Sequence, residues 1–394
     1  MGLASTSKAQ LSFVEEVTFG VTPATAGKDL RMTGESLAYA IQTAPSSEIN
    51  ASRQVSDVVQ VGASAQGGVN IELNYHEYDP FLEALLAGTF TTFGTNGVKA
   101  ITSATFAKTA NTITGAGTDF ATIVNGQWIS ITGTAAVSAG VAREYRVVTA
   151  TNTVLTLDTD TPIAADAAAI ACNVCTSRLT NGVAALRSFS LQKYFSDVGQ
   201  YFVYRGMSPS KLDLSFDTGS ILKGSVSFMG ADGARADAGF VTTPAVSQAF
   251  GVMNAVTGVG TVLLNGDLIT GTYIKSAKIS VDGKLRGQTA IGHLGNVGIG
   301  QGTFEIGGTL EMYLASGAIY DLALAGNVVS IQIPVMDVAK NGYAFIFNNV
   351  KLGVPTVQAG SKDADVMLSV PFTAVAPSST DKMLIIDRFG AAAA

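Results

Sequence analysis

Few side chains in this sequence combine the types and spacing that catalysis or metal binding requires. Cys172 and Cys175 form a CxxC pair, but zinc would need two further ligands, and His76 and His293 lie far from it in the sequence. A thioredoxin-like site would need a βαβ context, which the neighbouring residues do not predict. We therefore expect two buried or partly exposed thiols here, with no catalytic, cofactor or metal site.

Other polar clusters give equally weak signals. The glycine-rich residues 298–302 are not followed by a helix start, so they indicate strand ends rather than a phosphate loop. Asp158, Asp160 and Asp166 lack EF-hand spacing and are typical of a solvated acidic loop. Paired carboxylates could do acid/base work, but nothing selects a pair, so an enzyme such as a carbohydrate hydrolase is a minor alternative.

The composition favours a protein whose surface is covered by other chains. Charged residues make up 14% of the 394 residues, against about 25% in an average soluble protein, and hydrophobic residues make up 47%. The formal net charge of −6 predicts no broad attraction for nucleic acid. Residues 1–16 contain no apolar stretch, and the uncharged run 239–266 is interrupted by Gly and Pro, so we expect neither a secretory signal nor a membrane span.

Strict alternation of apolar and polar residues predicts a β-rich fold. The clearest cases are residues 69–75, 212–217 and 329–333, each with one apolar and one polar side. Only two segments, 79–88 and 316–326, carry helical signals. In the first of them, Asp79 is expected to cap the helix, ahead of Pro80.

One order of elements occurs twice along the chain. Each predicted helix follows an amphipathic strand with one acid, Glu72 or Glu311, and ends in a similar Leu-Ala-Gly sequence. An alternating strand and then an aromatic strand follow each helix, and each half closes with a hairpin, residues 211–228 or 355–372. The shared order favours duplication of one module, which could build a ring.

The two copies differ by an insertion. About 100 residues separate Gly88 from Phe189, whereas the second copy passes directly from Gly326 to Val328. Residues 95–181 are rich in Thr and Ala and contain their own predicted strands. We expect a small β domain on the outside of the protein, with Trp128 seeding its core.

Six stretches outside the insertion form a recognisable combination, namely residues 11–23, 30–37, 46–57, 78–88, 189–206 and 224–230. Together they resemble the major tail tube proteins of siphophages, which are long-tailed bacteriophages with non-contractile tails. The resemblance implies a mainly β fold with two tandem tail-tube β-sandwich modules, each with a short flanking helix, plus an inserted small β domain. The first module would comprise residues 1–94 and 182–238, the inserted domain 95–181 and the second module 239–394.

The same resemblance implies a structural virion protein that is not an enzyme and needs no cofactor. Its rings would stack into the tail tube that conducts genomic DNA into the host cell, after assembly in the host cytoplasm. Its partners would be further copies of itself, the tape measure protein and the tail-terminal and tip proteins, with only transient passage of double-stranded DNA. The alternative is another β-rich phage structural protein, such as a decoration, baseplate or fibre component.

Three hypotheses about assembly follow from these observations. Two modules per chain predict a trimeric ring with pseudo-sixfold symmetry. The segment 45–62 is expected to reach an adjacent ring through the loop that carries Glu48, Arg53 and Asp57, with residues 1–10 and 375–394 as secondary candidates. An acidic channel wall without cations is expected from the polar strand faces, whose proposed members are Glu72, Asp213, Asp217 and Glu311, with Asn70, Asn74, Ser215, Ser225, Ser227, Ser330 and Gln332 beside them.

Overall fold

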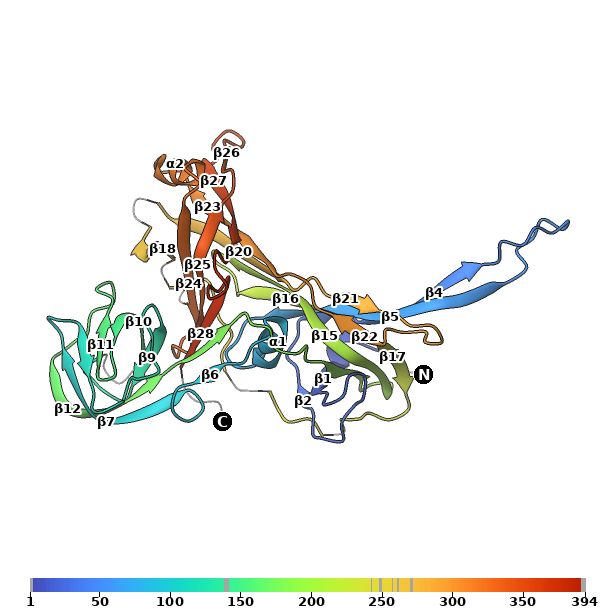
Figure 1. Ribbon diagram of the computed structural model, residues 1–394, viewed down its shortest axis with the longest axis horizontal. Helices are drawn as coiled ribbons and strands as arrows, with labels where there is room; N and C mark the ends of the chain where they lie inside the picture. The colour runs from blue at the N-terminus through green and yellow to red at the C-terminus, as the bar shows by residue number, and fades with distance from the viewer. Residues whose placement is uncertain are drawn as a thin grey trace.

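The computed structural model describes residues 3–137, 142–241, 243–247, 250–256, 258–260, 262–269 and 272–390. Strands dominate this part of the chain, and the α-helices within it are two short ones, α1 (Asp79–Leu85) and α2 (Ala318–Leu324). Pro80 lies in the first turn of α1, where the missing proline N–H costs no helix hydrogen bond. The predicted mainly β fold with two short helices is confirmed (Figure 1).

Two groups of strands build the main body, and we call them the first and second strand sets. The first comprises β1 (Ala9–Glu15), β2 (Lys28–Asp29), β3 (Gly34–Glu35), β4 (Ala38–Pro45), β5 (Val58–Glu72), β14 (Phe189–Phe195), β15 (Gln200–Asp217), β16 (Lys223–Gly230) and β17 (Asp232–Ala236). The second comprises β18 (Leu263–Leu264), β19 (Asp267–Leu268), β20 (Ile274–Asp282), β21 (Arg286–Gln288), β22 (Gly298–Gly300), β23 (Glu305–Tyr313), β24 (Val328–Met336), β25 (Gly342–Leu352), β26 (Thr356–Gln358), β27 (Met367–Ala374) and β28 (Ile385–Phe389).

The pairing order of the first strand set recurs in the second. In the first set, strands pair in the order β1–β14–β15–β16–β5–β4, and β17 also pairs with β15. In the second, they pair in the order β18–β24–β25–β27–β23–β20, and β28 also pairs with β25. A short helix follows β5 in one set and β23 in the other. The same arrangement of strands and helix therefore occurs twice.

The two strand sets are joined through their sheets. β15 pairs with β20 antiparallel over seven residue pairs, from Lys211↔Asp282 to Asp217↔Ser276. Buried apolar residues from both sets, including Leu214, Ile279 and Phe345, belong to one hydrophobic core. The main body is thus continuous in both hydrogen bonding and packing.

The segment between α1 and β14 forms a separate closed barrel (Figure 1). Its strands are β7 (Val98–Ala107), β8 (Thr112–Thr114), β9 (Trp128–Thr132), β10 (Arg143–Ala150), β11 (Val154–Leu157) and β12 (Ala167–Cys175). It has its own core, which includes Ile113, Phe120 and Tyr145. Two short strands tie it to the main body, β6 (Thr91–Thr92) and β13 (Ser177–Thr180), and β13 pairs with β28.

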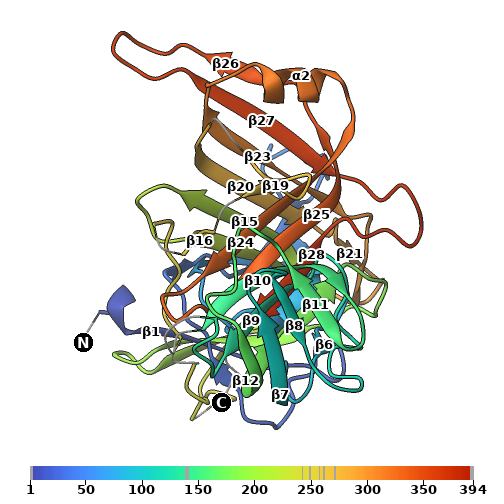
Figure 2. The same ribbon diagram turned by 90° about the vertical axis from the view of Figure 1, so that its left-hand side faces the viewer.

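The prediction that Trp128 seeds the core of this barrel is wrong. Ile129 and Ile131 of β9 belong to the barrel core, so Trp128, one residue earlier, points to the opposite side of the strand. There it packs against Met336 and Phe389 of the second strand set, with ring centroids of Trp128 and Phe389 6.3 Å apart. Figure 2 shows the barrel in front of β24, β25 and β28. Trp128 therefore docks the barrel on the main body.

Two hairpins project from the main body. The long arm, which we define as residues 38–72, consists of β4, β5 and the loop between them, and it extends far from the remaining chain (Figure 1). The short arm, residues 286–300, consists of β21 and β22. It lies beside the root of the long arm, where the Ala63 amide donates to the Leu294 carbonyl at 2.7 Å. Both arms occupy the same place in their strand sets, because the long arm is the β4–β5 hairpin and the short arm lies between β20 and β23, the counterparts of β4 and β5 in the second set.

Candidate channel wall, subunit edges and buried junctions

The four proposed channel acids share one face of the joined sheet. Register places Glu72 opposite Lys223, Lys223 opposite Ser215, Ser215 opposite Lys278, and Lys278 opposite Thr309. Directly paired residues point to the same face of a sheet, and so do residues two apart on one strand. Asp213 and Asp217 therefore share the face of Ser215, and Glu311 shares that of Thr309. We call this face the polar face.

The polar face is concave and open to solvent, whereas the opposite face of the sheet packs into the hydrophobic core. A cavity of about 620 Å³ lies on it, lined by side chains of β5, β16, β15, β20 and β23. The alternate residues Ile71, Leu214, Ile279 and Leu310 are 1–3% exposed and pack into the hydrophobic core. One polar and one apolar side per strand follow directly from the period-two alternation in the sequence.

Cations share this face with the acids, so the expectation of a wall free of cations is wrong. Lys211, Lys223 and Lys278 lie on it, in register with Ser227, Glu72 and Ser215 respectively. Lys211 forms an ion pair with Asp213 at 2.8 Å. The sequence predicts these lysines on the polar face, because each stands two residues before a serine of that face on the same strand, Lys223 on β16 and Lys278 on β20.

Two residues proposed for the wall lie elsewhere. Asn74 is 1% exposed and stands beyond the end of β5. Gln332 is 4% exposed and accepts a hydrogen bond from Trp128 Nε1 at 3.1 Å, so the docked barrel covers it. Both residues occupy polar positions of an alternating segment, but other parts of the chain cover them.

The three proposed inter-ring residues lie at the tip of the long arm. Glu48, Arg53 and Asp57 are all exposed. The loop is closed by the Ser46 amide, which donates to the Asp57 carbonyl at 2.8 Å, and Asn50 Nδ2 donates to the Gln54 carbonyl at 2.7 Å. Apolar side chains are also exposed along the arm, namely Ile41, Ile49, Val55, Val58, Val59 and Val61. The arm thus presents an apolar surface with charges at its tip.

The terminal segments are divided between described and undescribed residues. Of the secondary inter-ring candidates, residues 1–2 and 391–394 lie outside the described residues. Residues 385–389 form β28, which is buried between β25 and β13. This part of the C-terminal segment therefore lies within the fold, and the prediction that it contacts another ring is wrong.

A buried polar junction joins α1 to the second strand set. The Asp79 carboxylate accepts hydrogen bonds from Tyr343 Oη at 2.6 Å and Arg388 Nη1 at 2.5 Å. His76 Nδ1 lies 2.9 Å from the same carboxylate. Asp79 was predicted to cap α1, but Tyr78 occupies the N-cap, and the Asp79 side chain faces β25 and β28 instead.

The charged form of Asp79 is favoured in spite of burial. Burial is the largest influence and opposes ionisation, but the hydrogen bond from His76 and the charge of Arg388, together with the Tyr343 hydroxyl, outweigh it and lower the pKa of Asp79. Arg388 also lies over the Phe90 ring, 4.6 Å from its centroid. The junction therefore holds the charged Asp79 of α1 against Tyr343 of β25 and Arg388 of β28.

A second buried junction fixes the barrel. Arg178 of β13 binds Asp387 of β28 through two hydrogen bonds of 2.6 and 2.7 Å. The other contact comes from β9, where the Trp128 amide donates to Asp387 Oδ2 at 2.8 Å. Sequence reasoning missed this site, although Asp387 and Arg388 are adjacent opposite charges within an apolar strand of a charge-poor chain.

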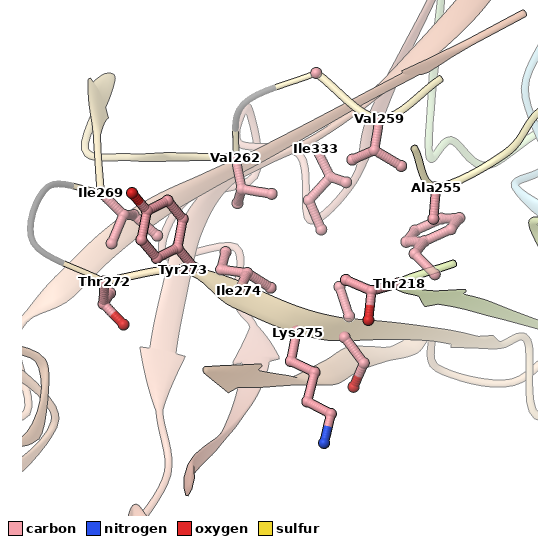
Figure 3. Close-up of a pocket in the computed structure, with 14 residues that line it drawn as sticks. Thr218, Ala255, Val259, Val262, Ile269, Thr272, Tyr273, Ile274, Lys275 and Ile333 are labelled. Atoms are coloured by element: carbon pink, nitrogen blue, oxygen red, sulfur yellow. The ribbon is translucent and has the colours of Figure 1, made fainter. Parts of the chain in front are cut away.

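The cavities and thiols offer little chemistry. Figure 3 shows a cavity of about 360 Å³ surrounded by apolar side chains such as Val259, Val262 and Ile333. Its described lining contains Lys275 and Tyr273 but no carboxylate, thiol or imidazole. Cys172 and Cys175 are free and buried, and burial is the main cause that raises the pKa of each thiol to about 11. Within the described ranges, no group of three or more His, Cys, Asp or Glu side chains could hold a metal ion.

Comparison with known proteins gives the family. The family model described as phage tail tube protein matches residues 6–374, which include the first strand set, the barrel and the second strand set except β28. The chain therefore belongs to the phage tail tube protein family and is a structural component of the virion tail. A search of curated proteins finds no match. No helix among the described residues is long and apolar enough to span a membrane.

Proposed function

We propose that three copies of this chain close into a ring with pseudo-sixfold symmetry, and that the rings stack into the tail tube of a siphophage. The observation that carries the proposal is the pairing of β15 with β20, which joins two similar strand sets edge to edge within one chain. Repeating that joint between chains would extend the sheet around a channel. The domain division into residues 1–94 with 182–238, 95–181 and 239–394 belongs to this proposal.

The free sheet edges identify the strands that would meet between copies. In the second strand set, β20 is the edge strand that pairs with the first set. Its counterpart in the first set is the β3–β4 segment, which pairs only with β5 among the described residues. On the opposite edge, β26 pairs only with β27 in the described chain, and its three residues are exposed. We therefore pair β3–β4 of one copy with the β25–β26 edge of the next.

Unpaired edges of this kind are unfavourable in an isolated protein. Free N–H and C=O groups on an edge strand recruit other strands, so proteins usually protect such edges. A closed ring satisfies every inner edge, and three identical joints close without leaving one open. The low content of charged residues fits the large interfaces that a stacked tube requires.

The long arms supply the contacts between rings in this proposal. Beyond Gly68, β5 continues for ten residues to Val58, which is about 33 Å at 3.3 Å per residue. That length, the exposed apolar side chains and the charges of Glu48, Arg53 and Asp57 suit an interface with the next ring. The channel would conduct double-stranded DNA, and the tape measure, tail-terminal and tip proteins would contact the tube. Assembly would take place in the host cytoplasm.

Proline substitution on the free edge tests the ring joint. Successive N–H groups of a strand point to opposite sides, so one of Thr356→Pro and Val357→Pro removes an N–H from the free edge, while the other removes one from the β27 side. The free-edge variant should fold, as judged by circular dichroism, yet stay monomeric at concentrations at which the wild type assembles. Normal rings from both variants would refute this joint.

A further inference from the structure

Two lysines on the polar face stand in a continuous row with hydroxyl side chains. The row crosses four neighbouring strands in the order Lys223, Ser215, Lys278 and Thr309. Neighbouring strands lie about 4.8 Å apart, so the two lysine positions are separated by about 10 Å. All four residues line the concave cavity of about 620 Å³.

Neither lysine is neutralised by an ion pair in the part of the chain that the structure describes. Three acids stand one row away, Asp213 and Asp217 on either side of Ser215 and Glu311 beside Thr309. Asp213 pairs with Lys211 at 2.8 Å, and Asp217 and Glu311 accept hydrogen bonds from the Ser215 and Ser276 hydroxyls at 2.6 and 3.0 Å. Glu72 stands directly opposite Lys223 at the end of the row, but the two side chains form no ion pair within 4 Å. Both ammonium groups are therefore free to bind an anion, and Glu72 weakens the field at Lys223 more than at Lys278.

The chemistry of the row selects a phosphodiester backbone. Lysine offers a mobile point charge suited to phosphate, and serine and threonine hydroxyls are common phosphate contacts that carry no sequence information. The two cations lie on an open sheet face rather than in a closed pocket, so an extended polyanion fits better than a small phosphate ester. The row carries no planar guanidinium or aromatic platform, which a base-reading site would use.

We propose that this row contacts the phosphates of duplex DNA on the wall of the channel through Lys223, Lys278 and Thr309, while the Ser215 hydroxyl between the two lysines donates to Asp217 at 2.6 Å. The identity of the duplex as the DNA in the channel rests on the proposed function. With this row, the channel wall attracts DNA at the lysines instead of only repelling it. DNA phosphates are attracted by the lysines and repelled by the acids of this face. Lys278 is the stronger contact, because the Glu72 carboxylate weakens phosphate binding at Lys223. Each phosphate contact forms and breaks as the duplex moves, and added salt weakens each one.

The test uses the unassembled full-length chain, in which the polar face is open. Binding of a fluorescent 20-base-pair duplex is measured by anisotropy from about 20 to 200 mM salt. Each lysine contact contributes about 0.9 to the slope of log affinity against log salt. Lys278→Gln and Lys223→Gln should each reduce that slope by up to this amount, with the larger loss for Lys278→Gln, and Glu72→Gln should tighten binding. Lys108→Gln, which removes an exposed lysine of the barrel, is the matched control.

The outcomes separate this inference from the proposed function. Slopes and affinities of Lys278→Gln and Lys223→Gln equal to those of Lys108→Gln would overturn the phosphate row, even if the same preparations form rings in micrographs. Failure of the wild type to form rings would overturn the ring proposal and leave the binding comparison intact, because that comparison uses single chains. Tighter binding by Lys278→Gln would also contradict the row.

Discussion

Removing the Asp79 carboxylate should destabilise the chain more than any comparable change on its surface. In Asp79→Ala, the Arg388 guanidinium, whose side chain is 9% exposed, loses its carboxylate while staying buried. The Tyr343 hydroxyl loses its acceptor at the same time. Breaking a buried pair from one side costs about 3–5 kcal/mol, because the remaining charge is uncompensated. That is a large part of the stability of a typical domain, about 5–15 kcal/mol.

A double-mutant cycle gives the sharper expectation. Arg388→Met should also be costly because it leaves the Asp79 carboxylate buried without its cation. The double variant removes both charges, and apolar replacement of a whole buried pair is often close to neutral. We expect the double variant to cost less than the sum of the singles by about 2 kcal/mol or more, since contacting residues couple by about 0.5–3 kcal/mol.

Urea unfolding followed by the fluorescence of Trp128 measures these costs, because this tryptophan lies between the barrel and the main body. Asp232→Ala is the matched control. Its ion pair with Arg205 is 3.5 Å long and its side chain is 52% exposed, so its loss should cost about 0–1 kcal/mol. The reasoning fails if Asp79→Ala behaves like Asp232→Ala, or if the costs of Asp79→Ala and Arg388→Met are additive.

Four further predictions follow. The pKa of Asp79 is lowered in the folded state, so its ionised form stabilises the fold above the unfolded pKa of about 3.9, and this stabilisation is lost as the pH falls through the folded pKa. The difference in free energy of unfolding between wild type and Asp79→Asn should therefore shrink from about pH 5 to about pH 3. An unchanged difference would show that Asp79 does not titrate in this range. With thiol pKa values of about 11, Cys172 and Cys175 should resist thiol reagents in the native protein at pH 8 and react after unfolding, and fast native labelling would disprove their burial. Deleting residues 47–58 should leave a folded protein that no longer forms long tubes, and electron micrographs showing normal tubes would count against the role of the arm. Glu72→Lys with Glu311→Lys should still allow rings but slow DNA ejection, and wild-type ejection kinetics at low salt, from particles shown to contain the variant, would exclude these residues from the channel.

Alternation along single strands made the polar face predictable from the sequence. The side on which a residue lies is a local property of an extended chain, so Glu72, Asp213 and Asp217 could be assigned to one face without knowing the pairing. The sequence pattern does not say what covers a polar face. Gln332 alternates with buried isoleucines as expected, but the barrel packs on its side of β24.

The buried junctions depend on contacts between distant parts of the sequence. Asp79 and Arg388 are 309 residues apart, and their pairing requires β28 to lie beside β25 with α1 against both. No local pattern encodes such a contact, so the preference of aspartate for helix N-caps suggested a role that the tertiary structure overrides. The position of Trp128 also depends on tertiary contacts, because an apolar residue at the start of a strand can face either side of the sheet.

Cryo-electron microscopy of assembled tubes tests the central claim most directly. The account predicts rings of three chains, with six similar β-sandwich positions around the channel and three barrels. The joint between chains should resemble that between β15 and β20, with the polar face inside. Rings that contain six chains, or a channel lined by the reverse face of the sheet, would contradict it.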